Sequence, residues 1–399
     1  MASKRTHKFP APRSLPVISL FSGAGGLDVA VERSAEPALE QDGTAGPFAI
    51  AVATDYDERA LTTLRANMPL TPTLIGDIRQ VSVKEILAAA GVGVGEAALL
   101  VGGPPCTPFS KSGFWIEEKR ESRDPNASLL DDYVRVLREA KPQAFILENV
   151  QGLTYSTHRD QFKRLLTAMD DLGYNPSWRV LIAAQYGVPQ LRRRVFVVGR
   201  RDGGSLRMPS PTHSGISERE FVGDPNLRPF VTTKEVLADL LPGVPEKGEI
   251  VDGTFGALAA SVPPGENYLW HTERGGGEPV FKWRSRYWTF LLRISPDRPA
   301  TTIQAQPGPW VGPFHWENVD TPNGPRARRL RVPEILAIQT FPVSFVVPEM
   351  TLTKDRQALQ RQIGNAVPVE LGKAVVRSVA EQMGWLPAST GLDSQHTIF

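Results

Sequence analysis

Cys106, the one cysteine of the 399-residue chain, lies in a segment whose composition suits a reactive thiol. It follows a strand-like run at 98–101 and is enclosed by two glycines and three prolines in the sequence GGPPCTPF. A structural buried cysteine, the alternative, normally has apolar rather than turn-forming neighbours. A thiolate fixed at the end of a strand is a candidate nucleophile.

A carboxylate and a run of arginines mark two further strand-like segments. Glu148 follows the apolar run at 144–147, where a carboxylate is costly to bury unless it is protonated or meets an N–H donor. The sequence QLRRR at 190–194 opens another strand, and alternation along a strand places Arg192 and Arg194 on one face. Two cations on one face suit an anionic or carbonyl-rich ligand. The alternatives are a helix cap for Glu148 and a solvated charge run for the arginines.

Groups that suit a nucleotide cofactor follow the first three strand-like runs. The loop FSGAGG at 21–26 lets a ligand approach the backbone closely, although position 28 is Asp where a dinucleotide fingerprint has Gly. Asp55 ends the second run, where a carboxylate can accept hydrogen bonds from ribose hydroxyls, and Asp77 ends the third. Tyr56 can stack on an adenine face. Each acid alone could be a helix cap or a turn residue, but the three strand ends together favour an adenosine-containing cofactor.

These groups need a scaffold that brings strand ends together. Through the first 200 residues, strand-like runs alternate with helix-like segments, which predicts an α/β fold with a doubly wound, mostly parallel sheet. Such a sheet binds ligands at the carboxyl ends of its strands. Beyond residue 200, Gly and Pro are frequent and periodic runs are few, which indicates a smaller irregular domain. We expect helices at 26–33, 58–66, 83–90, 129–140, 158–172, 233–241 and 369–383, and strands at 15–21, 49–54, 73–75, 98–101, 144–147, 179–183 and 195–198.

The charge balance excludes a strongly basic protein. Lys and Arg number 45 and Asp and Glu 43, a formal net charge of +2, so nucleic-acid binding would depend on local clusters. One cluster has four arginines within 326–331, and the other has Lys282, Arg284 and Arg286 alternating with aromatic residues. Both are candidates for phosphate or base contacts, with an exposed charged face as the alternative. The polar segment 111–126 has the composition of a mobile lid.

The composition also argues against metal binding and membrane insertion. A single cysteine excludes a Cys-based metal cluster, and the six histidines lack ligand spacing. No apolar run approaches the roughly 18 residues of a membrane span, and the N-terminus lacks the apolar region of a secretory signal. We therefore expect a cytoplasmic protein without a metal ion.

Five motifs in order, FSGAGG, PPC, ENV, QLRRR and QIGNAVP, resemble those of the bacterial C5-cytosine DNA methyltransferases. The resemblance extends from about residue 15 to 383 and implies a Rossmann-like fold that binds S-adenosyl-L-methionine. It implies that duplex DNA is the substrate, that the target cytosine is flipped out, and that a restriction endonuclease or other defence proteins act on the same DNA. We expect a monomer. The expected domains are a basic N-terminal arm (1–14), a catalytic domain that binds the cofactor (15–200), a target-recognition domain (201–300), a C-terminal block whose helix returns to the catalytic domain (301–385) and a tail (386–399).

The resemblance also implies roles for individual residues. Cys106 matches the nucleophile that adds to cytosine C6, and Glu148 matches the acid that contacts N3 and the exocyclic amine. Arg194 matches the arginine near O2, with Arg192 as its partner. Thr107 departs from the family's usual Gln, and His315-Trp316 departs from the commoner His-Pro. The implied cofactor contacts are Phe21, Gly23, Ala24, Gly25, Asp55, Tyr56, Asp77, Ile78, Pro104, Asn365 and Ala366, and the expected DNA contacts are Ser110, Lys282, Arg284, Arg286 and Arg328.

Three other functions fit the sequence less well. An RNA cytosine methylase of the same family is disfavoured because segment 201–300 is long enough for a DNA-reading domain. A non-catalytic relative would lack the Cys or Glu motif, and both motifs are intact. A nicotinamide dehydrogenase on the same kind of sheet is disfavoured by Asp28 in the glycine loop and by the ENV and QLRRR motifs.

Overall fold

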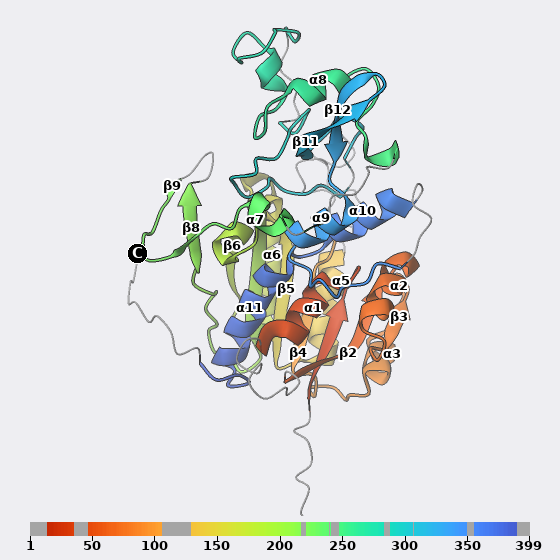
Figure 1. Ribbon diagram of the computed structural model, residues 1–399. Helices are drawn as coiled ribbons and strands as arrows, with labels where there is room; N and C mark the ends of the chain where they lie inside the picture. Colours follow the sequence, from red (N-terminus) through yellow and green to blue (C-terminus); the bar gives the residue numbers. More distant parts are fainter. Residues whose placement is uncertain are drawn as a thin grey trace, which may run out of the picture.

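One seven-stranded sheet forms the centre of the protein. The computed structural model describes residues 14–35, 47–105, 129–216, 221–238, 240, 247–282, 288–305, 307–348 and 355–388. The strands lie in the order β3-β2-β1-β4-β5-β7-β6 (Figure 1). Their bounds are β1 (Leu15–Leu20), β2 (Phe48–Asp55), β3 (Thr73–Ile75), β4 (Leu99–Gly102), β5 (Ala144–Val150), β6 (Ser177–Ile182) and β7 (Arg193–Arg200).

Most of this sheet is parallel. β1 pairs in parallel with β2 and with β4, and the pairs β2–β3 and β4–β5 are parallel too. β7 runs antiparallel to both β5 and β6. The connection from Ile182 to Arg193 is shorter than the crossover of a dozen or more residues that parallel neighbours need. The predicted α/β fold with a doubly wound, mostly parallel sheet is confirmed.

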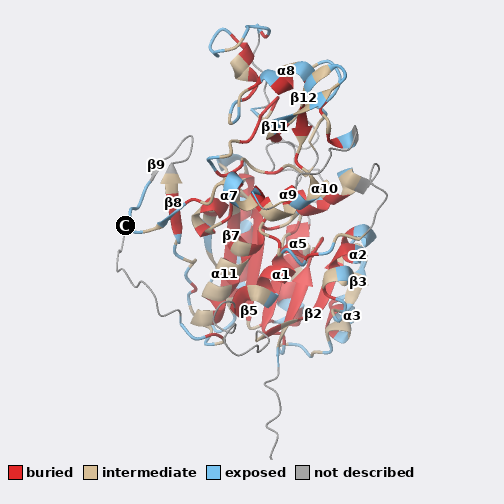
Figure 2. Ribbon diagram, viewed as in Figure 1, coloured by how far each residue is buried: buried red, intermediate tan, exposed pale blue. Residues whose placement is uncertain are grey.

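Helices cover both faces of the sheet, so its central strands are buried on both sides, whereas the edge strands β3 and β6 are partly exposed (Figure 2). Val17 and Ile18 are neighbours on β1 but belong to different hydrophobic cores, because successive side chains of a strand point to opposite faces. Helices α1 and α11 contribute to the core around Val17, and α3, α5 and α6 contribute to the core around Ile18. The helix bounds are α1 (Gly26–Glu32), α2 (Glu58–Asn67), α3 (Val83–Ala90), α5 (Leu129–Ala140), α6 (Arg159–Asp171) and α11 (Val369–Gln382).

The C-terminal helix α11 packs directly on α1, the helix that follows the glycine-rich loop. The two helices approach closely at Gly372, where an added Cβ would lie 2.8 Å from the Cβ of Ala30. The end of the described chain therefore supports the N-terminal part of the sheet.

A second lobe has its own hydrophobic core and lies beyond the sheet, with α9 and α10 at the boundary (Figure 1). Its core is aromatic: the ring of Phe255 lies 5.3 Å from Phe290 and 5.0 Å from Trp310, centroid to centroid. The elements outside the large sheet are β8 (His213–Ile216), β9 (Phe221–Val222), β10 (Arg228–Pro229), α7 (Thr233–Leu237), α8 (Gly256–Ser261), β11 (Phe314–Thr321), β12 (Gly324–Arg329), α9 (Val332–Ile338) and α10 (Asp355–Asn365). Short 3-10 helices occur at Arg33–Ala35, Gln151–Thr154, Ser156–His158, Ala183–Tyr186, Lys247–Glu249 and Tyr268–His271.

Most predicted elements agree with the structure to within a few residues. The helices expected at 83–90 and 129–140 have the observed bounds, whereas the helix expected at 233–241 ends at Leu237. Among the described residues, no helix is both long enough and apolar enough to cross a membrane.

Candidate active site

The candidate residues gather at the carboxyl ends of the parallel strands. β1, β2, β4 and β5 point the same way, so their C-terminal ends meet at one edge of the sheet. The glycine-rich loop follows β1, Asp55 ends β2, the segment 103–105 follows β4, and Glu148 lies near the end of β5. Cys106 itself lies outside the described residues, as do Ser110, Arg284, Arg286 and the expected lid at 111–126.

The glycine-rich loop is held in shape by Asp55. The backbone N–H of Gly23 donates to Asp55 Oδ2 at 2.8 Å, and the N–H of Asp57 donates to Oδ1 at 2.9 Å. Phe21, Gly23 and Gly25 all have positive φ angles, of 54°, 56° and 91°. Positive φ is a left-handed conformation that favours glycine, so Phe21 carries backbone strain at this turn.

The loop also contacts the QIGNAVP segment. A Cβ added to Gly26 would lie 2.7 Å from the carbonyl oxygen of Val367 and 2.9 Å from the Cβ of Ala366. Only glycine therefore lets the segment that contains Asn365 and Ala366 lie this close to the loop. Ala24, the remaining loop position expected to contact the cofactor, is buried.

The other residues predicted to contact the cofactor near Asp55 differ in their exposure and in the partners they already have. The ring of Tyr56 is 71% exposed beside the loop, which leaves its face open for stacking. Asp77 already binds Arg79, whose Nε lies 2.9 Å from both carboxylate oxygens, and this pairing lowers the pKa of Asp77. Ile78 is buried. An adenine amine would therefore compete with Arg79 for the Asp77 carboxylate.

Glu148 and Arg194 form a buried pair at the end of β5. Arg194 Nε lies 2.8 Å from Glu148 Oε1, with side-chain exposures of 14% and 10%. Burial raises the pKa of Glu148, and this effect exceeds the opposite effects of Arg194 and Arg192. The other oxygen, Oε2, would lie 2.9 Å from a Cβ on Gly103, so glycine is needed there for the carboxylate to occupy this place.

The segment that leads to Cys106 is tied to the same strand. Asn149 Nδ2 donates to the carbonyl oxygen of Pro104 at 3.2 Å. Between β4 and β5, the buried Tyr133 hydroxyl lies 3.0 Å from the carbonyl oxygen of Ile146. These contacts fix the position of Gly103–Pro105 relative to Glu148, directly before the cysteine.

Arg192 belongs to the same charge cluster as Arg194 and Glu148, because both of these groups affect its pKa. β7 begins one residue later, at Arg193, but the carbonyl oxygen of Arg192 still accepts from the N–H of Ala183 at 2.8 Å, next to the β6–β7 pairing. Its guanidinium is fully buried and donates to two backbone carbonyls, those of Ile303 and Asn365, both at 3.3 Å. Burial lowers its pKa. Arg192 therefore joins chain segments, and its role as the partner of Arg194 stays a prediction.

The arginine cluster at 326–331 differs from the prediction. Arg328 is buried, and both of its terminal nitrogens bind Glu334, at 2.8 and 2.9 Å. Arg331 binds the same carboxylate, and Arg326 lies 3.5 Å from Asp252. A buried arginine that is bidentate to a carboxylate is not offered to DNA, so the predicted DNA contact at Arg328 is corrected to a structural ion pair. The sequence signal that was overlooked is a glutamate six residues later.

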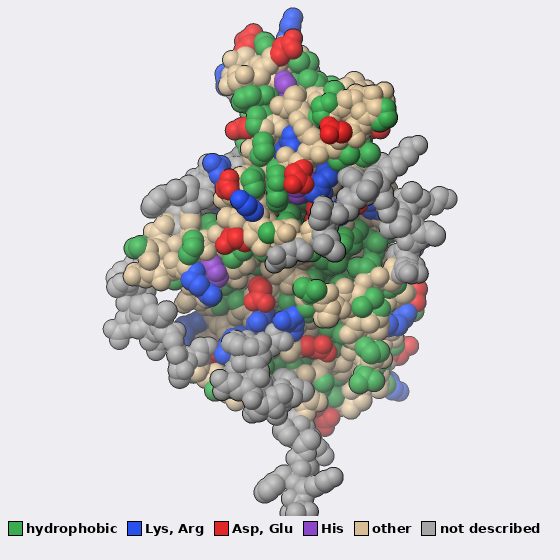
Figure 3. All heavy atoms as spheres, viewed as in Figure 1, with side chains coloured by type: hydrophobic (Ala, Val, Ile, Leu, Met, Phe, Trp, Pro, Cys, Tyr) green, Lys and Arg blue, Asp and Glu red, His purple; other side chains and the backbone are tan. Residues whose placement is uncertain are grey.

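The remaining surface charge is mixed. Lys282 is exposed, and acidic and basic side chains are interspersed on the face shown in Figure 3. The described residues contain no group of three or more His, Cys, Asp or Glu side chains that could hold a metal ion.

Sequence reasoning missed several residues that shape this site. Gly103 and Asn149 lie next to residues of the PPC and ENV motifs, and this position in the sequence is the signal that could have identified them. Gln339 is fully buried and hydrogen-bonded to Gln190 at 3.0 Å across 149 residues of sequence. No local pattern reports such a long-range contact.

Comparison with known proteins identifies the family. The family model of the C-5 cytosine-specific DNA methylases matches residues 15–381, and the chain belongs to this family. It is an S-adenosylmethionine-dependent DNA cytosine methyltransferase of the type II restriction–modification type. The chain is 64% identical over 383 residues to the type II methyltransferase M.SacI of Streptomyces achromogenes, covering 96% of this chain and 97% of that one. The type II methyltransferase M.NgoPII of Neisseria gonorrhoeae is 27% identical over 383 residues, covering 92% and 96%.

Solved structures share the fold. The Entamoeba histolytica methyltransferase EhMeth and the S. pombe Dnmt2 methyltransferase each superimpose with a TM-score of 0.60, at 16% and 17% identity. Each match covers 93% of this chain and 99% of the other. At this identity the likeness concerns the fold alone.

Proposed function

We propose that the enzyme methylates C5 of a flipped cytosine, within a specific duplex DNA sequence, through a covalent bond between Cys106 and C6. The observation that carries the proposal is the buried Glu148–Arg194 pair, with Oε2 against Gly103, three residues before Cys106. A carboxyl group and a cation therefore lie beside Gly103, in the segment that leads to the proposed nucleophile. We propose further that a restriction endonuclease acts on the same DNA sequence, because the relatives are named type II methyltransferases.

The glycine-rich loop fits an adenosine cofactor such as S-adenosylmethionine. The positive φ angles of Gly23 and Gly25 shape the turn at the strand end, and a Cβ on Gly23 would meet no atom within 4 Å. Asp55 offers its carboxylate beside this turn, and the Tyr56 ring is open. When bound, the cofactor supplies an electrophilic methyl group. We assign the ribose to Asp55 and the adenine face to Tyr56, with Phe21, Pro104 and the 365–366 turn as further lining.

The chemistry requires activation of the pyrimidine ring, because C5 of cytosine is a poor nucleophile. The Cys106 thiolate adds to C6, and the electrons of the C5–C6 double bond make C5 electron-rich. Glu148, whose pKa is raised by burial, can hold or share a proton at N3 and so offset the negative charge that develops on the ring. Arg194 adds a fixed positive charge beside the carboxyl group. After C5 is methylated, loss of the C5 proton to a base releases the thiolate and restores the aromatic ring.

The second lobe is our candidate for the domain that reads the DNA sequence. It has a core of its own, and the exposed Lys282 precedes the segment that holds Arg284 and Arg286. Flipping the base costs a few kcal/mol of stacking and pairing energy, which contacts from this lobe would offset. Lys282, Arg284, Arg286 and Ser110 remain predicted DNA contacts.

A methyl-transfer assay tests the proposal. The enzyme is incubated with tritiated S-adenosylmethionine and either duplex DNA or tRNA, and the labelled DNA is sequenced after bisulfite treatment. We expect label in DNA at one cytosine of one sequence context, and none for Cys106→Ser, which still binds the cofactor. Near-normal turnover by Cys106→Ser would refute the covalent route, and preferential labelling of tRNA would refute the DNA assignment.

A further inference from the structure

Two buried glutamines form a hydrogen-bonded chain between segments that are distant in sequence. Gln190 Oε1 accepts from the backbone N–H of Ile303 at 3.1 Å, and Gln190 Nε2 donates to Gln339 Oε1 at 3.0 Å. Gln339 Nε2 in turn donates to the carbonyl oxygen of Ile363 at 2.7 Å. Both glutamine side chains are fully buried. We call this chain of hydrogen bonds, from Ile303 through Gln190 and Gln339 to Ile363, the amide relay.

The relay has a fixed direction. Each amide accepts on the side of Ile303 and donates on the side of Ile363, so neither can turn without placing two acceptors or two donors face to face. Buried polar groups in this position are costly to leave unpaired. The relay therefore specifies one arrangement of the segments that it joins.

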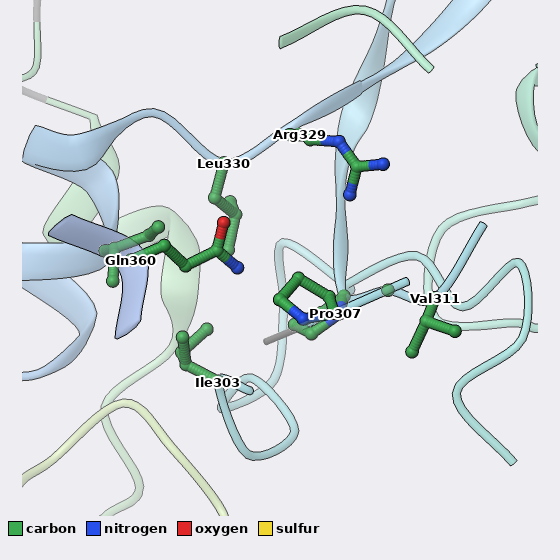
Figure 4. Close-up of a pocket in the computed structure, with 9 residues that line it drawn as sticks. Ile303, Pro307, Val311, Arg329, Leu330 and Gln360 are labelled. Carbon is green, nitrogen blue, oxygen red and sulfur yellow. The ribbon is translucent and has the colours of Figure 1, made fainter. Parts of the chain in front are cut away.

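One end of the amide relay leads to the Glu148–Arg194 pair. Gln190 lies four residues before Arg194, whose Nε is 2.8 Å from Glu148. Between them, Arg192 donates to the carbonyl oxygen of Ile303, so Ile303 is held through both its N–H and its carbonyl group. The Ile303 side chain lines a small cavity between the lobes, together with Leu330, Pro307 and Gln360 (Figure 4).

The other end leads to the cofactor loop. Ile363 lies in the last turn of α10. Ala366 and Val367, which come just after this helix, are the residues that a Cβ on Gly26 would meet. The backbone carbonyl of Gln339 also accepts from Val369 N–H at 3.1 Å. Gln339 thus holds both sides of the turn that packs on the glycine-rich loop.

We propose that the amide relay sets the position of the Glu148–Arg194 pair relative to the cofactor loop, which makes Gln190 and Gln339 positioning residues for methyl transfer. This inference rests on the proposed function. Neither glutamine touches the reacting atoms, and each acts through Arg194 or through the turn at 363–367. The relay joins the two halves of the active site across the sheet edge.

The test replaces one donor at a time. Gln190→Glu keeps the acceptor for Ile303 and removes the donor to Gln339, and Gln339→Glu removes the donor to Ile363. Gln360→Glu is the matched control, because Gln360 donates to the Gln304 carbonyl at 3.3 Å in the same region but is outside the relay. Gln190→Asn, which keeps the amide but shortens it, serves if the Glu variants do not fold.

The measurement is the single-turnover rate constant with cofactor and DNA saturating, together with the amplitude, the KM for DNA and the dissociation constant of S-adenosylmethionine. We expect a rate constant at least 10-fold lower for either relay variant and for Gln190→Asn, with KM for DNA within about twofold, and no more than a twofold change for Gln360→Glu. The double variant Gln190→Glu with Gln339→Glu should lose less than the product of the single losses, because the two residues act as one unit.

If Gln190 and Gln339 only stabilise the fold, the variants should behave differently. Destabilised variants would show a smaller amplitude and a lower unfolding temperature, but their rate constant would equal that of the wild type. That outcome overturns the inference, as does an equal loss in Gln360→Glu. If the wild type itself transfers no methyl group to DNA, the proposed function fails, so the two failures are distinguishable.

Discussion

Replacement of Gly103 by alanine tests how closely the Glu148 carboxylate is positioned. The added Cβ would lie 2.9 Å from Oε2, whereas ordinary van der Waals contact begins near 3.4 Å, so the carboxylate must move by about half an ångström. This movement disturbs the 2.8 Å contact between Oε1 and Arg194. A misplacement of about 1 Å can lower a rate by about 100-fold. We therefore expect a rate roughly 10-fold lower, equivalent to about 1.4 kcal/mol of transition-state stabilisation.

The assay is single-turnover methylation of duplex DNA at saturating cofactor, with the dissociation constant of the cofactor measured in parallel. Gly248→Ala is the control, because a Cβ there has no neighbouring atom within 4 Å. We expect the control to match the wild type and Gly103→Ala to keep its cofactor affinity. Wild-type rates in Gly103→Ala would show that the carboxylate does not need its present position, and the reasoning about Glu148 would be wrong.

Three further predictions concern single side chains. Glu148→Gln should lower the single-turnover rate by about 100-fold or more, because an amide cannot deliver a proton to N3, and an unchanged rate would remove Glu148 from the mechanism. Asp28 is fully buried, and burial raises its pKa to about 7, with Glu32 and Asp55 acting in the same direction. The folded protein therefore holds a proton that the unfolded chain loses between about pH 4 and pH 7, so its stability falls as the pH rises through this range. Asp28→Asn should remove up to about 4 kcal/mol of this loss. If urea unfolding gave the same difference in unfolding free energy between Asp28→Asn and wild type at pH 5 and at pH 8, this reasoning would be contradicted. Arg328→Ala should lower the free energy of unfolding by about 3 kcal/mol, because it leaves the buried Glu334 carboxylate without its bidentate partner, while a large loss of DNA affinity without a loss of stability would restore the predicted DNA contact.

The sequence predicted the elements with strong local patterns. Helix α3 begins at a capping box, in which Ser82 and Glu85 bond each other's backbone N–H groups, and ends at Gly91 in the left-handed conformation. Both signals can be read from sequence alone. The parallel part of the sheet follows from alternating apolar strands and amphipathic helices, so the sequence alone predicts that the strand ends carrying Asp55 and Glu148 lie together.

The missed features depend on contacts that local patterns do not report. Arg192 donates to the carbonyl groups of Ile303 and Asn365, which lie 111 and 173 residues further along the chain. Arg328 looked like one of four exposed arginines, and only the folded chain brings its guanidinium into the buried site beside Glu334. Gln190 and Gln339 meet only when the end of α9 has packed beside the segment that precedes β7. Long-range packing, rather than propensity, decides these positions.

The central claim is that the Cys106 sulfur bonds to C6 of the target cytosine, and 5-fluorocytosine in the recognition sequence tests it directly. Fluorine at C5 leaves no proton to remove after methyl transfer, so the sulfur–carbon bond cannot be released. The account predicts that the wild-type protein with cofactor and fluorinated duplex gives a complex that survives denaturation, with the mass of protein plus methylated DNA, and that Cys106→Ser gives none. An enzyme that methylates the unmodified duplex but never forms this complex would contradict the account.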